Sequence, residues 1–159
     1  MASSLVAGIR VRAPSEADLA AVAGLIAQLG YPPTVAQMRA RLQDLAASAA
    51  DHVFVADVDG AVAGLATLHV ARLPQMDKPR AELTALVTDA GFRRRGVARK
   101  LLEAVEDAAR GEGCDLLFLR TNQQRDDSHA FYRDNGFQET HLTFNKELTR
   151  GVRRDNANG

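Results

Sequence analysis

Several residue types that would point to particular functions are rare in this sequence or missing from it. Cys114 is the only cysteine among 159 residues, and there is no tryptophan. A single thiol forms neither a disulfide within the chain nor a thiolate zinc cluster. The four histidines show no metal-ligand spacing, so the sequence predicts no metal site.

A surplus of charge of one sign is missing as well. Twenty basic and twenty acidic residues give a formal net charge of zero. A dedicated nucleic-acid binder normally carries a basic surplus, so we expect no nucleic-acid partner. No apolar run approaches membrane-spanning length. Residues 1–8 lack the charged region and long apolar stretch of a secretion signal, so we expect a cytoplasmic protein without membrane contact.

What is present is the composition of an ordinary globular domain. The chain has 46% hydrophobic and 25% charged residues, enough for one domain with a sizeable core. Apolar patterning predicts strands over 9–12, 52–58, 61–71, 81–88 and 115–121, with one or two more within 137–148. Apolar residues at helical spacing predict helices that begin near residues 15, 34, 97 and 126.

Local signals refine these elements and indicate the fold class. Asp59-Gly60 predicts a hairpin turn, and we expect the third helix to bury Ala98 together with the leucines that follow it. The order of elements predicts an α/β (α+β) domain over 9–148. Its sheet is expected to be mixed, mostly antiparallel and six- to seven-stranded, with about four helices. Residues 149–159 are polar and predict a flexible C-terminal tail.

The most informative segment joins the strand 81–88 to the third helix. Residues 93–99 read Arg-Arg-Arg-Gly-Val-Ala-Arg. A helix N-terminus offers unpaired N–H groups and a partial positive charge, which favour phosphate oxygens. Gly96 and Ala98 leave room for a ligand to touch the backbone, and the arginines add charge. A strand, a basic turn and a helix in this order predict a diphosphate site.

A second motif lies downstream of the basic turn. Residues 130–137 read Ala-Phe-Tyr-Arg-Asp-Asn-Gly-Phe, and residues 93–98 fit the pattern Arg/Gln-x-x-Gly-x-Gly/Ala. With these two motifs at this separation, the chain resembles the GNAT superfamily of acetyl-CoA-dependent N-acetyltransferases. The resemblance covers nearly all of 9–148 and includes the order of elements.

The resemblance implies a place for acetyl-CoA, the expected co-substrate. Backbone groups of Leu86, Val87 and Thr88 would pair with the pantetheine arm, and the N–H of Val87 or Thr88 would polarise the thioester carbonyl. Main-chain N–H groups of the turn and first helical turn would wrap the diphosphate, over residues Arg93, Arg94, Arg95, Gly96, Val97, Ala98 and Arg99.

The resemblance also implies two catalytic residues. Tyr132 would lie near the thioester sulfur, where a phenol can protonate the departing thiolate. Glu82 precedes the carbonyl-binding residues on their strand, where many family members place a carboxylate. It would accept the amine proton directly or through water.

Each of these side chains also has a purely structural interpretation. Tyr132 could be a half-buried core aromatic, and Glu82 could face solvent or pair with an arginine. His69 could face the acceptor cleft or lie on an outer strand face. Tyr31 lies in a turn near which the family's acceptor cleft usually forms, and His129 could cap or pack a short helix.

The sequence therefore predicts an enzyme that moves the acetyl group of acetyl-CoA to a primary amine by direct attack. A small-molecule acceptor is expected, because Arg120 replaces a glutamate that some protein-acetylating members use. Arg125 replaces a cofactor-contacting asparagine of many members, so that role is not carried over. Two alternatives stay open, a non-catalytic acyl-CoA-binding or regulatory module and a protein N-terminal or lysine acetyltransferase. A homodimer, common in relatives, is also open.

Overall fold

The computed structural model describes residues 8–121 and 126–148. These residues form two compact units, the first within 8–121 and the second within 126–148. The expected tail over 149–159 and Arg125 lie outside the described residues.

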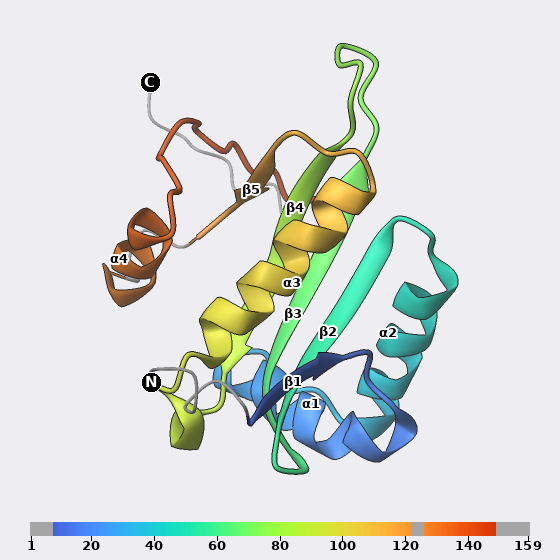
Figure 1. Cartoon of the computed structure of the whole chain (residues 1–159). Coiled ribbons are helices and arrows are strands. Elements are labelled where there is room, and N and C mark those ends of the chain that lie inside the picture. The colour runs from blue at the N-terminus through green and yellow to red at the C-terminus, as the bar shows by residue number, and fades with distance from the viewer. Residues whose placement is uncertain (1–7, 122–125, 149–159) are drawn as a thin grey trace, which may run out of the picture. The chain divides into compact units, whose positions relative to one another are not determined.

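A five-stranded mixed sheet forms the centre of the first unit (Figure 1). Its strands follow chain order across the sheet: β1 Ile9–Arg12, β2 Asp51–Val58, β3 Ala61–Ala71, β4 Arg80–Thr88 and β5 Leu117–Leu119. Strands β1 to β4 are antiparallel neighbours, whereas β5 joins β4 in parallel. The expected fold class and the mostly antiparallel sheet are confirmed.

Local sequence signals set the ends of several elements. Asp59 and Gly60, with φ of 51° and 87°, form the tight turn between β2 and β3 that the sequence predicts. Thr34 caps α2 Val35–Ala47, because its hydroxyl accepts from the Gln37 N–H at 3.1 Å. The Gln37 side chain accepts from the Thr34 N–H at 2.9 Å, which completes a capping box.

The three α-helices of this unit lie on opposite faces of the sheet (Figure 1). α3 Val97–Gly111 packs on one face of β3 and β4, where Leu101 and Val105 are fully buried. α1 Leu19–Gln28 and α2 pack on the other face. The core cluster on that face contains Val22, Ala23, Leu25 and Met38 from the helices and Val55, Leu65 and Val87 from the sheet. With both faces covered, β3 is buried along most of its length.

Gly64 on β3 allows α3 to approach the sheet closely. A Cβ built on this residue would lie 2.9 Å from the Val87 carbonyl oxygen and 2.9 Å from side-chain atoms of both Val97 and Leu101. Real Cβ atoms essentially never make contacts that short, so only glycine fits here without a shift of its neighbours. Because Val97 is the first residue of α3, Gly64 sets the distance between the start of that helix and strand β3.

The second unit contains α4 Asp126–Asp134, which ends in a Schellman motif. The Phe137 N–H donates to the Tyr132 carbonyl at 3.0 Å, and the Gly136 N–H donates to the Arg133 carbonyl at 3.1 Å. Gly136 has the positive φ, 88°, that the motif requires. The Phe137 and Tyr132 rings meet edge to face, with centroids 5.5 Å apart. The downstream sequence motif is thus a helix end that holds the tyrosine ring in place.

Three expectations about the fold are wrong in detail. Residues 137–148 form no strand, so the sheet in the described part of the chain has five strands rather than six to seven. A strand needs a neighbour for its backbone hydrogen bonds, and the described residues of the second unit offer no other strand. β5 is shorter than the expected 115–121. In α3 the buried first-turn residue is Val97, and Ala98 is only half-buried.

Candidate functional site

Hydrogen bonds hold the end of β4 in place just before the basic turn. The Asp89 N–H donates to the Ala63 carbonyl at 2.8 Å. Gln28, the last residue of α1, donates to Asp89 Oδ1 at 2.7 Å and accepts from the Ala90 N–H at 3.2 Å. Helix α1 and strand β3 therefore fix the direction in which the chain leaves β4.

The basic turn that follows Asp89 and Ala90 leads into α3 through two residues with left-handed backbone. Gly96, the N-cap of α3, has φ 81°, and Arg94 has φ 62°. Among the described residues no acceptor pairs with the backbone N–H groups of 96–99, and the first helical bond runs from the Lys100 N–H to the Gly96 carbonyl at 3.1 Å. No atom lies within 4 Å of a Cβ built on Gly96. The turn thus presents four N–H groups that no acceptor in the described ranges engages, beside the open space at Gly96.

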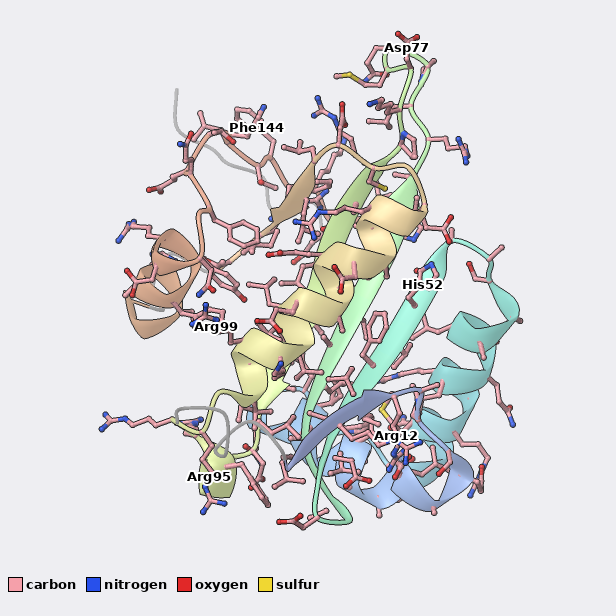
Figure 2. All side chains as sticks on the ribbon, in the orientation of Figure 1. Arg12, His52, Asp77, Arg95, Arg99 and Phe144 are labelled. Carbon is pink, nitrogen blue, oxygen red and sulfur yellow. The ribbon has the colours of Figure 1, made fainter. Side chains whose placement is uncertain are left out.

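The arginines of the turn are exposed. Arg93, Arg94 and Arg95 form no ion pair with any residue in the described ranges. The Arg95 guanidinium lies 5.3 Å from the centroid of the Phe92 ring. Figure 2 labels Arg95 and Arg99 beside the N-terminal end of α3, where Arg99 makes one surface ion pair at 3.8 Å. Cationic charge and free N–H groups therefore meet at this turn.

Strand β4 has an open edge beyond a β-bulge. Leu83 pairs with Leu68 and Ala85 with Thr67, so Thr84 is an extra residue on β4. The Thr84 and Thr67 hydroxyl oxygens are 2.5 Å apart. β5 pairs with β4 only as far as Leu83, so no described strand covers that edge of β4 beyond it. Backbone groups on such an edge can pair with an extended ligand. The open stretch contains the residues expected at the pantetheine arm: Leu86, Val87 and Thr88.

Three polar side chains from three strands share one face of the sheet at the other end of β4. His69 pairs in register with Asp51 on β2 and with Glu82 on β4, so all three point to the same side. His69 Nδ1 lies 2.8 Å from Asp51 Oδ1. The side chains of Asp51 and Glu82 are 19% and 21% exposed, and that of His69 is 42% exposed. The structure thus brings together two residues that the sequence singles out, Glu82 and His69.

The three side chains form a polar row of Asp51, His69 and Glu82. Glu82 has a cationic neighbour, Arg120, outside this row. Arg120 Nε lies 3.6 Å from Glu82 Oε1, and the Arg120 guanidinium lies 6.0 Å from the centroid of the Phe118 ring. Phe118 is the register partner of Glu82 on β5. Because the Arg120 side chain is 62% exposed and the ion pair is long, this pair holds the carboxylate only weakly.

Tyr132, the expected general acid, lies on α4 in the second unit. Its half-buried ring packs edge to face against Phe131 and Phe137, with centroids 5.5 Å away in each case. The Schellman motif fixes the backbone around it. Its catalytic role stays a prediction.

The remaining candidates are peripheral. Tyr31 is 72% exposed just past α1, and His129 lies half-buried on α4. Burial raises the pKa of the Cys114 thiol, and the carboxylates of Glu112 and Asp115 add to this, so the thiol is a poor nucleophile. No group of three or more histidine, cysteine or acidic residues in the described ranges could hold a metal. None of the helices described is long and apolar enough to cross a bilayer.

Sequence reasoning misses three residues that build this site. Gly64 could have been found, because a glycine inside a strand often marks a close backbone approach. Gln28 and Asp51 carry no such signal, because their partners Asp89 and His69 are 61 and 18 residues away in sequence.

A strand with an open edge, a glycine turn and a helix with free N–H groups form a frame suited to an extended ligand that carries phosphate groups. The sequence model of a protein family, the acetyltransferase (GNAT) family, matches residues 24–137, more than half of the chain. The chain therefore belongs to the acetyltransferase (GNAT) family. The expected family and enzyme class, an acyltransferase, are confirmed.

Two relatives are similar over much of the chain. An aminoalkylphosphonate N-acetyltransferase of Salmonella typhimurium is 32% identical over 97 residues, 61% of this chain and 63% of the relative, so the match spans less than two thirds of that protein. A glucosamine 6-phosphate N-acetyltransferase of Oryza sativa subsp. japonica is 28% identical over 140 residues, 84% of this chain and 83% of the relative.

A solved structure supports the fold. An aminoglycoside N-acetyltransferase in complex with CoA superposes with a TM-score of 0.77 at 23% identity, over 89% of this chain and 95% of that one. At this identity the likeness concerns the fold alone.

Proposed function

We propose that the protein transfers the acetyl group of acetyl-CoA to the primary amine of a small molecule. The observation that carries the proposal is the run of N–H groups at residues 96–99, which have no acceptor within 8–121 and 126–148, next to an edge of β4 that no described strand covers. Family membership supports acetyl-CoA as the co-substrate. The proposed catalytic domain spans 9–148 and contains the whole family match.

The cofactor would lie along β4 and end at the turn. Its pantetheine arm would pair with the backbone of Leu86, Val87 and Thr88, where no described strand competes. Its diphosphate would accept hydrogen bonds from the N–H groups of 96–99, with Arg93, Arg94 and Arg95 adding positive charge. The left-handed φ of Gly96 and the empty space beside it suit close approach of phosphate oxygens.

The chemistry would need a base and an acid. Glu82 would receive the proton of the attacking amine. Leu86, the nearest residue of the pantetheine-binding stretch, is four residues further along, about 13 Å on an extended strand. The proton would therefore reach Glu82 through water rather than directly. Tyr132 would protonate the departing thiolate, and an N–H of Val87 or Thr88 would stabilise the oxyanion.

The acceptor that we propose is a small primary amine that also carries a phosphonate or phosphate group. The two relatives are named for an aminoalkylphosphonate and for glucosamine 6-phosphate, which share an amine and a phosphorus oxyanion. The polar row formed by Asp51, His69 and Glu82 has charges of both signs at its Glu82 end, the carboxylate of Glu82 and the largely exposed guanidinium of Arg120 beside it, which would attract such a molecule to this end of β4.

Calorimetry with acetyl-CoA tests the cofactor site. Gly96→Val should weaken binding about 10- to 100-fold, comparable to losing one charge-assisted hydrogen bond, because its side chain enters the space for the diphosphate. Gly113→Val is the matched control, since Gly113 has nearly the same φ, 82°, just past the opposite end of α3. Equal affinities in the two variants would show that the diphosphate does not lie at this turn.

Thiol release across a panel of amines tests the reaction. The panel contains 2-aminoethylphosphonate, glucosamine 6-phosphate, an aminoglycoside and a lysine peptide. We expect turnover with the two phosphorus-containing amines. Tight binding of acetyl-CoA without turnover on any amine would instead favour the non-catalytic module, and turnover on the peptide alone would favour a protein acetyltransferase.

The panel also tests the proposed acid. Tyr132→Phe should lower kcat by about 100-fold, the low end of general acid catalysis, with acetyl-CoA affinity kept. Phe131→Leu alters the same ring cluster without removing a hydroxyl and is the matched control. If Tyr132→Phe keeps its turnover, Tyr132 is not the acid.

A further inference from the structure

The hydrogen bond between Asp51 and His69 determines which nitrogen of the His69 ring carries the hydrogen. Burial raises the pKa of Asp51, but hydrogen bonds from Ser48 and His69 outweigh it, so the net pKa lies below its usual value. An ionised carboxylate can only accept, so the hydrogen shared at 2.8 Å sits on His69 Nδ1. In the neutral ring Nε2 is then a proton acceptor. Asp51 therefore fixes the tautomer of His69 with its second nitrogen ready to receive a proton.

The groups around His69 come from each neighbouring element. Across β2 it meets Asp51, and across β4 it meets Glu82, with Cβ atoms of such opposed residues about 5 Å apart. Arg80 lies on the same face of β4, two residues from Glu82, and Arg120 pairs with Glu82 at 3.6 Å. Two helices pack on this face of the sheet: α1 carries no charged residue, and α2, which packs against β2, carries Arg39, Arg41 and Asp44. His69 thus stands between two carboxylates, and Arg80 and Arg120 lie on the Glu82 side.

The proposed reaction leaves one proton to be removed. An ammonium and a thioester become an amide, a thiol and one proton. As the new C–N bond forms, the C–S bond breaks. The nitrogen loses two protons in all, of which one balances the proton that the leaving thiolate takes up. The other must travel from the site to solvent in every cycle.

We propose that His69, held by Asp51, is the proton-relay residue that receives this proton from Glu82 across the β3–β4 pair and passes it to solvent. The inference rests on the proposed function and assigns His69 a positioning role, because it acts through Glu82. Its side chain is twice as exposed as that of Glu82, 42% against 21%. Imidazoles exchange protons readily near neutral pH, so this ring can connect a largely covered carboxylate with water.

A second histidine provides a matched control. His52 is the neighbour of Asp51 on β2 and is the register partner of Leu68, so it points to the opposite face of the sheet. Figure 2 labels it on β2. Its Nε2 also lies near a carboxylate, 3.3 Å from Glu112 Oε1. His52→Gln therefore removes an imidazole with a carboxylate neighbour from the same sheet, and it affects the polar row only through a small electrostatic effect on Asp51.

The experiment measures kcat/KM for 2-aminoethylphosphonate between pH 5.5 and 9 in the wild type, His69→Gln, Asp51→Asn and His52→Gln. His69→Gln should lower the value about 100-fold at pH 7, the low end of general acid–base effects. It should also remove the part of the acid limb that belongs to the imidazole. Asp51→Asn should give a smaller loss, and His52→Gln should keep the wild-type profile. Added imidazole should restore activity to His69→Ala, which a structural role would not allow.

The possible failures are distinguishable. Wild-type turnover together with an unchanged profile in His69→Gln, or with no rescue of His69→Ala, would overturn the relay and leave the acetyltransferase proposal standing. Absence of wild-type turnover on the whole amine panel would overturn both proposals. Acetyl-CoA affinity, measured by calorimetry, should be equal in all four proteins, and a loss confined to His69→Gln would mean that the ring supports the fold instead.

Discussion

Strand β4 has a proposed site toward each end, and the two are built differently. Toward its C-terminal end, the cofactor site consists mainly of backbone: the open edge of the strand and the N–H groups of residues 96–99. Toward its N-terminal end, the polar row consists of side chains from three strands, Asp51, His69 and Glu82. Backbone groups are the same in every residue except proline, so the first site should tolerate most side-chain changes. The second should tolerate few, yet its loss should leave cofactor binding intact.

The largest effect on activity should come from a change in the polar row, toward the N-terminal end of β4. Glu82→Gln should lower kcat by about 100- to 1000-fold, because the amide cannot accept the amine proton. Acetyl-CoA affinity should stay at the wild-type value, since the backbone site is unchanged. Steady-state kinetics and calorimetry measure the two quantities, with Glu103→Gln on the exposed surface of α3 as the control. Parallel losses of rate and affinity would mean that the two ends of β4 are not separate.

The cofactor site is best tested by a change in the packing that positions the start of α3. Gly64→Ala should destabilise the protein by about 1–3 kcal/mol, because the new methyl group meets Val97, Leu101 and the backbone of Val87. It should also weaken acetyl-CoA binding, because the start of α3 must move. Urea unfolding measures the stability. Gly24→Ala is the control, because no atom lies within 4 Å of its Cβ, and it should gain up to about 1 kcal/mol in helix α1.

Part of the acid dependence of stability should come from a residue outside both ends of β4. Arg12, labelled in Figure 2, donates to both Asp18 oxygens at 2.7 and 3.0 Å and also pairs with Asp57 at 3.2 Å. The Arg12 hydrogen bonds, with further hydrogen bonds from Ser15, lower the pKa of Asp18 from its usual 3.8 to about 2, against the opposing effect of burial.

Because the pKa of Asp18 is depressed in the folded state, its contribution is complete above about pH 4 and is lost as the pH falls toward 2. Asp18→Asn should cost about 1–3 kcal/mol at pH 7 and flatten that acid dependence. Urea unfolding at several pH values measures both effects, with the exposed Asp44→Asn as the control. An equally steep acid loss in Asp18→Asn would assign the dependence to other carboxylates.

The smallest effect on cofactor binding should come from the removal of one charge at the cofactor site. Arg94→Gly should weaken acetyl-CoA binding only a few-fold, because an exposed charge contributes about 0.2–1 kcal/mol while the N–H groups remain. Stability should change by less than about 1 kcal/mol, since relief of the left-handed backbone opposes the added freedom of glycine in the unfolded chain. Calorimetry measures the affinity and urea unfolding the stability. A loss as large as that of Gly96→Val would show that the guanidinium, not the backbone, holds the diphosphate.

The two sites also differ in how much of them the sequence could predict. Arg93 to Arg99 are consecutive, so their turn, helix start and free N–H groups follow from local rules about glycine and helix ends. The same holds for the end of α4, where Gly136 and Phe137 close the helix beside Tyr132. Apolar patterning predicts the strand that carries Glu82 and the family resemblance implies its role, but its neighbours His69 and Asp51 depend on strand register.

The final strands show the limit of local patterning. Leu142, Phe144 and Leu148 would fall on one side of an extended chain, yet all three are more than 80% exposed and their segment forms no strand. Alternation gives a segment an apolar side, but a strand forms only where a neighbour takes its backbone hydrogen bonds.

The amino-acid sequence by itself determined the cofactor turn, the helix ends, the β2–β3 hairpin and the family, because each depends on residues close together in the chain. Only the tertiary structure decided that His69 stands between Asp51 and Glu82 and that Gly64 sets the approach of α3. Those arrangements depend on which strands pair and in what register, and pairing is settled by burial over the whole sheet rather than by any single segment.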